Sequence, residues 1–279
     1  MKYISLSLYL LLFGLSVNAQ TQSKNISKNP LTIGEVMTFD SKILSESRTL
    51  NVYLPQGYNA KDTLTYPVIY VLDGGMDEDF IHVVGAAQFY NLQLEMPKSI
   101  VVGIANTDRK RDFTFPTTDR KLQKDYPTTG GSRKFISFLK DEVQAYISDT
   151  YATTQQKTLI GQSLGGLLAA EILFKTPKLF NNYIIVSPSL WWDNEALLKD
   201  AKMMMDSQSK ISAKVYIAVG TEGELMEGEA KRLYELLKSS GKSDLKAEFL
   251  FLPNENHKTI LHQGVMDSFK LMSGKPSEN

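Results

Sequence analysis

The sequence has no cysteine among its 279 residues. This absence excludes disulfides, a lipidated cysteine, and any thiolate nucleophile or thiolate metal site. A net charge is also absent, because 31 Lys and Arg residues balance 31 Asp and Glu residues. No block of like charge forms a basic tail, so we expect no nucleic-acid partner. Without disulfides, a folded chain of this composition must be stabilised by its hydrophobic core.

The first twenty residues have the pattern of a secretory signal peptide. Lys2 supplies a positive start, residues 4–15 are apolar apart from Ser and Gly, and Val17-Asn18-Ala19 offers small residues for cleavage after Ala19. The apolar run is short for a membrane span, and polar sequence follows it. We therefore expect removal of residues 1–19, export to the periplasm or the medium, and no integral membrane span afterwards. The alternative is an uncleaved N-terminal anchor.

The remaining sequence favours one α/β domain. Residues 20–30 are polar and predicted to be disordered, whereas residues 31–279 contain no internal repeat or low-complexity linker. Apolar runs typical of strands lie at residues 37–40, 49–54, 68–72, 99–104, 158–160, 183–186, 214–219 and 248–252. Helical patterns lie between them, at residues 135–148, 195–206, 230–239 and 263–272 among others.

This alternation predicts a mostly parallel central sheet with helices on both faces and two antiparallel leading strands at one edge. In such sheets the active site lies at the carboxyl ends of the strands. The loops that follow residues 72, 104, 160, 186, 219 and 252 are therefore the candidates for a site.

The stretch Gly161-Gln162-Ser163-Leu164-Gly165-Gly166 places one serine between a short strand and a helical pattern. A nucleophile elbow requires this order, because the chain turns sharply at the serine. Side chains two residues either side would clash, which glycine at Gly161 and Gly165 avoids. We therefore predict Ser163 as a nucleophile. The alternative is a glycine-rich turn without chemistry.

A serine hydroxyl needs a base within hydrogen-bond reach, and the sequence has only three histidines. His257 follows the last predicted strand at the expected sheet edge, and it follows the serine in the expected chain order. His82 and His262 fall in helical patterns and are interpreted as structural or surface residues. The sequence therefore favours His257 as the base.

The acid that orients the histidine should follow the strand at residues 214–219. The loop at residues 220–228 holds Glu222, Glu224 and Glu227. Glu222 is closest to the strand end and is preferred, Glu224 is the alternative, and Glu227 fits the first turn of the next helix. It stays open at this point whether these glutamates are merely solvent-facing acids.

Acyl transfer also needs N–H donors aimed at the developing oxyanion. The N–H of Leu164, directly after the serine, would supply one donor at a helix N-terminus. The loop Asp73-Gly74-Gly75 would supply the other through Gly74 or Gly75, while Asp73 holds the loop by hydrogen bonds.

Together these residues resemble the esterase family of α/β-hydrolases, which includes esterase D, feruloyl esterases, mycolyltransferases and enterochelin-type siderophore esterases. The resemblance covers residues 34–272 and includes the segments Tyr66–Gly74, Asn106–Arg109, Arg111–Thr114 and Ser187–Trp192. The last segment, Ser-Pro-Ser-Leu-Trp-Trp, is most similar to the siderophore esterases. The resemblance implies an α/β-hydrolase fold, with Ser163 as nucleophile, His257 as base, and Leu164 and the Gly74 region as oxyanion donors. The chain departs from feruloyl esterases at the acid, because it offers glutamates where an aspartate is common.

Two regions are candidates for substrate binding. Residues 105–134 carry eight Lys and Arg residues against four Asp residues, a local charge of +4. Arg109 or Arg111 could meet an anionic substrate, or both could belong to an Arg–Asp network within the loop. Of Trp191 and Trp192, one is expected to wall the acyl pocket and the other to lie in the core, because adjacent side chains rarely face the same way.

The sequence thus predicts an exported serine esterase that hydrolyses carboxylic esters through an acyl-enzyme and needs no cofactor or metal. Its expected partner is a small-molecule ester, with anionic esters included: a siderophore of the enterochelin type or another carbohydrate or aromatic acyl ester. An acyltransferase of the same fold and a catalytically silent binding domain are the alternatives. The sequence carries no signal of oligomeric state.

Overall fold

The computed structural model describes residues 27–61, 63–93 and 96–273. By its contacts the chain divides into two units, residues 1–32 and residues 33–279. The predicted signal peptide of residues 1–19 lies outside the described residues, as does most of the segment at residues 20–30. In the first unit, residues 27–32 adopt neither helix nor strand. Of the helices that the structure describes, none is both long and apolar enough to cross a bilayer.

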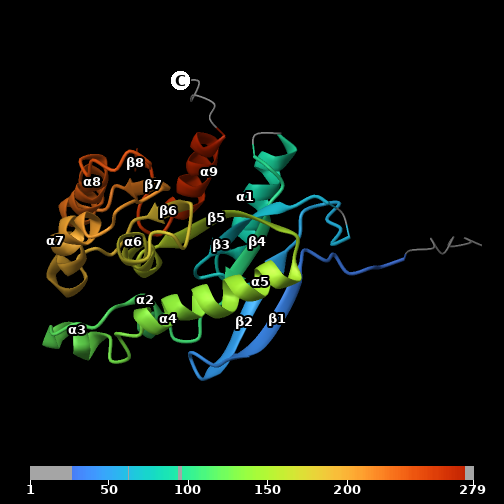
Figure 1. The fold of residues 1–279 in the computed structure, drawn as a ribbon, viewed down its shortest axis with the longest axis horizontal. Helices are drawn as coiled ribbons and strands as arrows, with labels where there is room; N and C mark the ends of the chain where they lie inside the picture. The colour runs from blue at the N-terminus through green and yellow to red at the C-terminus, as the bar shows by residue number, and fades with distance from the viewer. Residues whose placement is uncertain (1–26, 62, 94–95, 274–279) are drawn as a thin grey trace, which may run out of the picture. The chain divides into compact units, whose positions relative to one another are not determined.

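Within residues 33–279, eight described strands form one sheet in the order β1-β2-β4-β3-β5-β6-β7-β8 (Figure 1). The strands are β1 (Glu35–Ser41), β2 (Glu46–Tyr53), β3 (Tyr66–Val71), β4 (Ile100–Ile104), β5 (Thr153–Gln162), β6 (Asn182–Val186), β7 (Ala213–Gly220) and β8 (Leu245–Leu252). The β1–β2 and β2–β4 pairs are antiparallel, and every other pair is parallel. The predicted architecture, a mostly parallel sheet with antiparallel leading strands, is confirmed.

Helices cover both faces of this sheet (Figure 1). One face carries α1 (Phe80–Leu92) and α9 (Ile260–Met272), and the other carries α4 (Ser132–Phe138), α5 (Gln144–Thr150), α6 (Leu164–Lys175), α7 (Trp192–Asp206) and α8 (Glu224–Lys238). Successive side chains of a strand point to opposite faces, so Ile69 and Val71 pack in the first layer while Val68 and Tyr70 pack in the second. Burial on both faces explains why the central strands β3 and β4 are continuous apolar runs.

Helix α6 fixes the position of the predicted nucleophile, because it begins directly after Ser163. All of its residues from Leu164 to Phe174 are buried. Leu167 and Leu168 are completely excluded from solvent, and each such side chain contributes about 1.5–3 kcal/mol relative to an exposed one. A helix held this firmly allows the turn that precedes it to keep a strained backbone.

Helices α7 and α9 begin three residues before their predicted starts, and two other helical regions differ more from the prediction. The pattern at residues 135–148 is interrupted by a π-helical turn, η1 (Leu139–Val143). In this turn the Glu142 carboxylate accepts hydrogen bonds from the backbone N–H groups of Lys42 at 2.8 Å and Ile43 at 3.1 Å. Helix α8 begins at Glu224 rather than at the predicted residue 230, because the Glu227 carboxylate accepts from the N–H groups of Glu222 and Gly223 and so caps the helix start.

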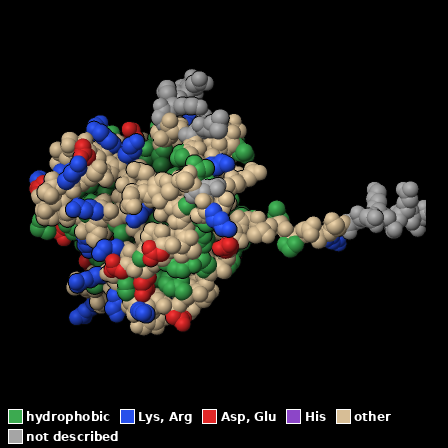
Figure 2. Space-filling model, turned by 45° about the vertical axis from the view of Figure 1, so that its right-hand side comes forward, with side chains coloured by type: hydrophobic (Ala, Val, Ile, Leu, Met, Phe, Trp, Pro, Cys, Tyr) green, Lys and Arg blue, Asp and Glu red, His purple; other side chains and the backbone are tan. Residues whose placement is uncertain are grey.

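The turn-rich region at residues 105–134 contains two short helices, α2 (Arg109–Phe113) and α3 (Arg120–Asp125). Their N-caps are Asp108, which accepts from Arg111 N, and Asp119, which accepts from Lys121 N and Leu122 N. These aspartates therefore cap helices instead of pairing with the neighbouring arginines. On the face shown in Figure 2, Lys and Arg side chains are interspersed with Asp and Glu, in keeping with the zero formal charge.

Candidate active site

Ser163 sits at a strained turn between β5 and α6, with φ 58° and ψ −119°. A non-glycine residue with positive φ costs of order 1–3 kcal/mol and is typical of functional sites. The backbone comes close to other backbone at two glycines of this turn. A Cβ on Gly161 would lie 2.4 Å from the Gly165 carbonyl oxygen, and one on Gly166 would lie 2.9 Å from the Cα of Pro188. The short distance to Pro188 explains why the residue after Gly165 is also a glycine, Gly166.

His257 lies in the loop between β8 and α9, with its side chain 43% exposed. The elbow holds this loop directly, because Gln162 Nε2 donates to the His257 carbonyl oxygen at 2.6 Å. The loop after β7 joins the same structure through Thr221 N, which donates to the Glu255 carbonyl oxygen at 2.8 Å. Three loops from the carboxyl ends of β5, β7 and β8 are thus tied together.

The imidazole of His257 meets the Glu222 carboxylate, with 2.6 Å between Nδ1 and Oε2. The Glu222 side chain is only 2% exposed. Its other oxygen, Oε1, accepts from the Ser187 hydroxyl and from Gly220 N at 3.1 Å. Glu224, the alternative acid, is the exposed first residue of α8. The structure therefore brings Glu222, and not Glu224, to His257.

The pKa of Glu222 is lowered from its ordinary value by these contacts. Burial alone would raise it, but the hydrogen bonds from His257, Ser187 and Gly220 favour the charged carboxylate and outweigh the burial. Glu222 is therefore an anion at neutral pH, as a group that orients an imidazole must be.

A pocket of about 680 Å³ opens at this edge of the sheet. Its lining residues are Ser163, Ser189, Trp191, Thr221, Glu222, Met226, Asn256, His257 and Lys258. Trp191 walls this pocket, whereas Trp192 is fully buried and donates from Nε1 to the Phe115 carbonyl oxygen at 2.9 Å. Ser189, Met226 and Lys258 were not singled out by sequence reasoning, although Ser189 belongs to the Ser-Pro-Ser segment noted above.

The predicted oxyanion donors differ in their present partners. Gly74 N donates to the Ile104 carbonyl oxygen at 2.9 Å, so this N–H is committed to the sheet edge. Gly75 N donates to Glu78 Oε2 at 2.7 Å. Leu164 N, at the first position of α6, has no hydrogen-bond partner among the described residues. Within the loop of residues 73–75 the candidate donor is therefore Gly75, because its partner is an exposed side chain and not the backbone of a strand.

The two candidate arginines form networks with carboxylates. Arg109 binds Asp73 through Nε at 2.6 Å and Nη2 at 2.9 Å, next to the Ser163 elbow. Arg111 binds Glu46 through both terminal nitrogens and Asp112 through Nε at 2.8 Å. Neither lines the pocket at Ser163. Of these partners only Asp112 belongs to the loop at residues 105–134, so the pairs differ from the Arg–Asp network expected within that loop: Asp73 follows β3 and Glu46 begins β2.

The other two histidines lie together away from this pocket. The rings of His82 in α1 and His262 in α9 contact each other with 4.8 Å between their centroids. Burial lowers the pKa of His82, and the neighbouring His262 adds to this effect. Both residues belong to the packing of α1 against α9.

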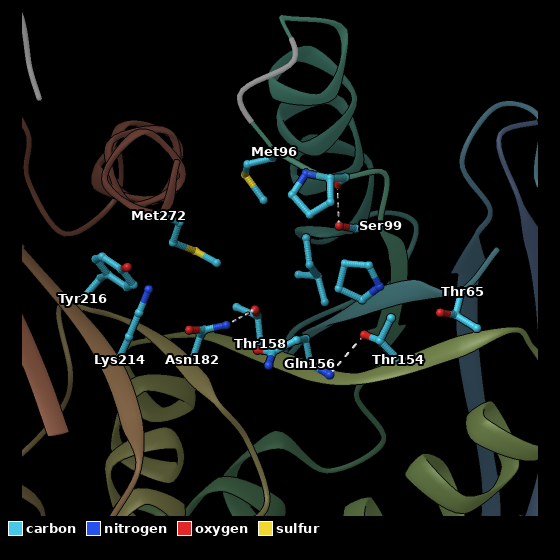
Figure 3. Close-up of a pocket in the computed structure, with 13 residues that line it drawn as sticks. Thr65, Met96, Ser99, Thr154, Gln156, Thr158, Asn182, Lys214, Tyr216 and Met272 are labelled. Atoms are coloured by element: carbon cyan, nitrogen blue, oxygen red, sulfur yellow. Dashed lines mark hydrogen bonds between the residues drawn. The ribbon is translucent and has the colours of Figure 1, made fainter. Parts of the chain in front are cut away.

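A second pocket, of about 570 Å³, lies near the amino ends of β5, β6 and β7 (Figure 3). Figure 3 shows Thr154, Gln156, Asn182, Lys214 and Tyr216 rising from the strands, with Met272 of α9 beside them. Its described lining contains no histidine and no carboxylate. The groups needed for acid–base chemistry are at the opposite edge, where Ser163 lies.

The sheet order, the serine turn at the end of β5 and the histidine loop after β8 define an α/β-hydrolase. The family model described as "Putative esterase" matches residues 41–258. The chain belongs to this family, in agreement with the resemblance found in the sequence.

Known relatives include proteins that are named as esterases. The chain is 28% identical over 240 residues to ferri-bacillibactin esterase BesA of Bacillus subtilis, a match that covers 78% of this chain and 82% of the relative. Among solved structures, an IroE-like serine hydrolase from Shewanella oneidensis superposes with a TM-score of 0.80 at 27% identity, covering 86% of this chain and 80% of that one. The BES protein from Bacillus cereus superposes with a TM-score of 0.76 at 27% identity, covering 88% and 98%.

Proposed function

We propose that this protein is a serine-dependent carboxylic ester hydrolase with Ser163, His257 and Glu222 as its catalytic triad. The observation that carries the proposal is the 2.6 Å contact between Glu222 and His257 in the same pocket as the strained Ser163 turn. Membership of the esterase family supports it. A silent binding domain would have no need of a buried, ionised carboxylate held against a solvent-accessible imidazole.

In the proposed reaction His257 Nε2 takes the proton of Ser163 as its oxygen attacks the ester carbonyl carbon. Glu222 stabilises the imidazolium that forms, and general-base assistance of this kind is worth ~10²–10⁴ in rate. The C–O bond to the alcohol then breaks, and His257 returns the proton to the leaving oxygen. In the second half of the reaction His257 takes a proton from a water molecule, whose oxygen attacks the acyl carbon. The C–O bond to Ser163 then breaks, and His257 returns the proton to the serine oxygen.

The negative charge on the carbonyl oxygen requires two donors, for which we assign Leu164 N–H and Gly75 N–H. Each such donor is worth ~10²–10³ in turnover. The Glu78 carboxylate that holds Gly75 N–H belongs to an exposed side chain. The reacting oxygen therefore replaces the Glu78 carboxylate on this N–H during the reaction.

We further propose a siderophore ester as the substrate. BesA is named as a ferri-bacillibactin esterase, and relatives from Aspergillus fumigatus and Emericella nidulans are named as siderophore esterases. The pocket supports such a ligand because Trp191 offers an aromatic face, Met226 an adaptable apolar contact and Lys258 a positive charge. Aromatic and anionic groups on one small molecule would use all three.

We also propose that the protein is exported after cleavage at Ala19. The apolar stretch at residues 4–15 and the small residues Val17-Asn18-Ala19 support this assignment. N-terminal sequencing of the protein recovered from a secreting host would test it. A start at Gln20 supports export, whereas an intact N-terminus on a cell-retained protein contradicts it.

A fluorophosphonate probe tests the catalytic assignment directly. We expect labelling of the wild-type protein, none of Ser163→Ala, and parallel loss of hydrolysis of p-nitrophenyl esters and of a ferric trilactone siderophore. Product analysis with a sugar acceptor present separates hydrolysis from acyl transfer. Folded wild-type protein that neither reacts with the probe nor cleaves any ester would exclude the proposal.

A further inference from the structure

The turn Ser187-Pro188-Ser189, which follows β6, contacts two members of the proposed triad. The Ser187 hydroxyl donates to Glu222 Oε1. Two residues later, Ser189 Oγ lies 3.2 Å from Ser163 Oγ. One short turn therefore faces both the acid and the nucleophile.

The backbone of this turn is fixed on both sides. Ser187 N donates to the Ala218 carbonyl oxygen in β7 at 2.7 Å, and Ser189 N donates to the Ser163 carbonyl oxygen at 3.0 Å. Ser163 N in turn donates to the Val186 carbonyl oxygen at 3.0 Å. The Ser187 hydroxyl thus projects from a rigid support toward the carboxylate.

The Glu222 carboxylate has few hydrogen-bond donors besides the Ser187 hydroxyl. Glu222 uses Oε2 for His257, so Oε1 depends on the Gly220 N–H at 3.1 Å and on Ser187. Ser187 is completely excluded from solvent, and water cannot readily take its place. A buried carboxylate that loses one of two donors on the same oxygen is held less firmly and is less favoured as an anion.

Ser187 also has φ 42°, in the left-handed region that favours glycine. A serine there costs stability that a glycine would not, and the proline that follows sets no demand for a hydroxyl. The hydrogen bond from its hydroxyl to Glu222, which glycine could not make, accounts for a serine at this strained position.

From these contacts we infer that Ser187 is a positioning residue of the active site, whose hydroxyl fixes the Glu222 carboxylate in the orientation that faces His257. The inference rests on the proposed function. It goes beyond the triad by assigning a task to the first serine of the Ser-Pro-Ser segment.

The left-handed backbone allows a sharp test, because Ser187→Gly removes the hydroxyl and relieves the strain together. We expect Ser187→Gly to melt close to the wild-type temperature, because the relieved strain offsets the lost hydrogen bond, yet to lose about ten- to hundredfold in kcat with KM little changed. Ser187→Ala should lose a similar factor while keeping the strain. A merely structural serine would give a Gly variant with full kcat, which would overturn the inference.

Ser45 provides a matched control. It has φ 58° in the β1–β2 turn, is exposed, and touches no residue of the pocket. Ser45→Gly should raise the melting temperature through the same backbone effect and leave kcat unchanged.

A double-mutant cycle separates positioning from general damage. In a Glu222→Ala background, Ser187→Gly should cost less than twofold in kcat, because the carboxylate that it positions is gone. Equal losses in both backgrounds would contradict the inference. If instead the wild-type protein shows no Ser163-dependent hydrolysis, the proposed function fails first, so the two failures are distinguishable.

Discussion

The Glu78 carboxylate accepts a hydrogen bond from the backbone N–H of Gly75, with 2.7 Å between Oε2 and the amide nitrogen. Its other oxygen accepts from Asn106 Nδ2 at 2.7 Å. An anion therefore occupies the donor that we assign to the developing oxyanion, and each turnover must displace it.

Removing this carboxylate is expected to speed the reaction. Glu78→Ala leaves Gly75 N–H free, so we predict that kcat rises about two- to tenfold, the value of one hydrogen bond that no longer has to be broken. The measurement is steady-state hydrolysis of a neutral p-nitrophenyl ester. Asp77→Ala is the control, because it removes the same charge from the neighbouring exposed residue without freeing the N–H. A fall in kcat for Glu78→Ala alone would argue that Glu78 supports the loop and that Gly75 is not the donor.

The choice between two neighbouring glutamates gives a second prediction. Glu222→Gln keeps the shape of the side chain but removes the charge that stabilises the His257 imidazolium, so kcat should fall about 10²–10⁴-fold. Glu224→Gln alters an exposed residue at the start of α8 and should leave kcat within twofold. Steady-state assays of ester hydrolysis measure kcat for both variants. Comparable activity of the two variants would remove Glu222 from the triad.

The sheet and the serine turn could be predicted from the sequence because both restrict which residue types can occupy their positions. A strand buried on two faces must be apolar throughout, as β3 and β4 are, and the turn at Ser163 admits only glycine at Gly161. Strand ends were less predictable. The first half of β5, Thr153–Lys157, is polar because part of it lines the second pocket, so only residues 158–160 gave an apolar signal.

The supporting residues of the site could not be predicted in this way. Gln162, Ser187 and Lys258 act across loops that are far apart in the sequence, and their contacts depend on the register of β5, β6, β7 and β8. Arg111 shows the converse, since its place in a charged loop suggested substrate binding while Glu46, on β2, occupies its guanidinium. A partner on a distant strand leaves no local pattern.

The buried carboxylate of Glu229 predicts an unusual dependence of stability on pH. Glu229, in α8, is completely buried, and neither oxygen has a partner in hydrogen-bond geometry among the described residues. Burial, with a smaller effect from Glu195, raises its pKa from 4.5 to about 7, which Arg232 and the nearby Trp191 N–H only partly oppose. Between these two pH values the unfolded chain has lost a proton that the folded protein keeps. The contribution of Glu229 therefore lowers stability as pH rises from 4.5 to about 7, and remains unfavourable above that.

Glu229→Gln should abolish this effect. We compare the free energy of unfolding of the variant with that of the wild type at each pH. The advantage of the variant should be larger at pH 8 than at pH 5 by on the order of 2 kcal/mol. Urea denaturation at the two pH values measures the difference. Glu235→Gln, an exposed change on the same helix, should show no comparable dependence. An equal effect of Glu229→Gln at both pH values would mean that the carboxylate finds a partner in solution.

Charge selectivity should depend on Lys258 and not on Arg111. Lys258 lines the pocket beside His257, whereas Arg111 is neutralised by Glu46 and Asp112 outside the pocket lining. Because Lys258 is exposed, solvent screens its attraction, and Lys258→Ala should raise KM for an anionic ester only about two- to fivefold while sparing a neutral ester of the same acyl group. Arg111→Ala should leave the KM ratio of the two esters unchanged and lower the melting temperature, since it leaves the Glu46 and Asp112 carboxylates to share one cation, Arg48. Raising the salt concentration should shrink the Lys258 effect. A selective rise in KM for the anionic ester in Arg111→Ala would instead return the substrate contact to the loop at residues 105–134.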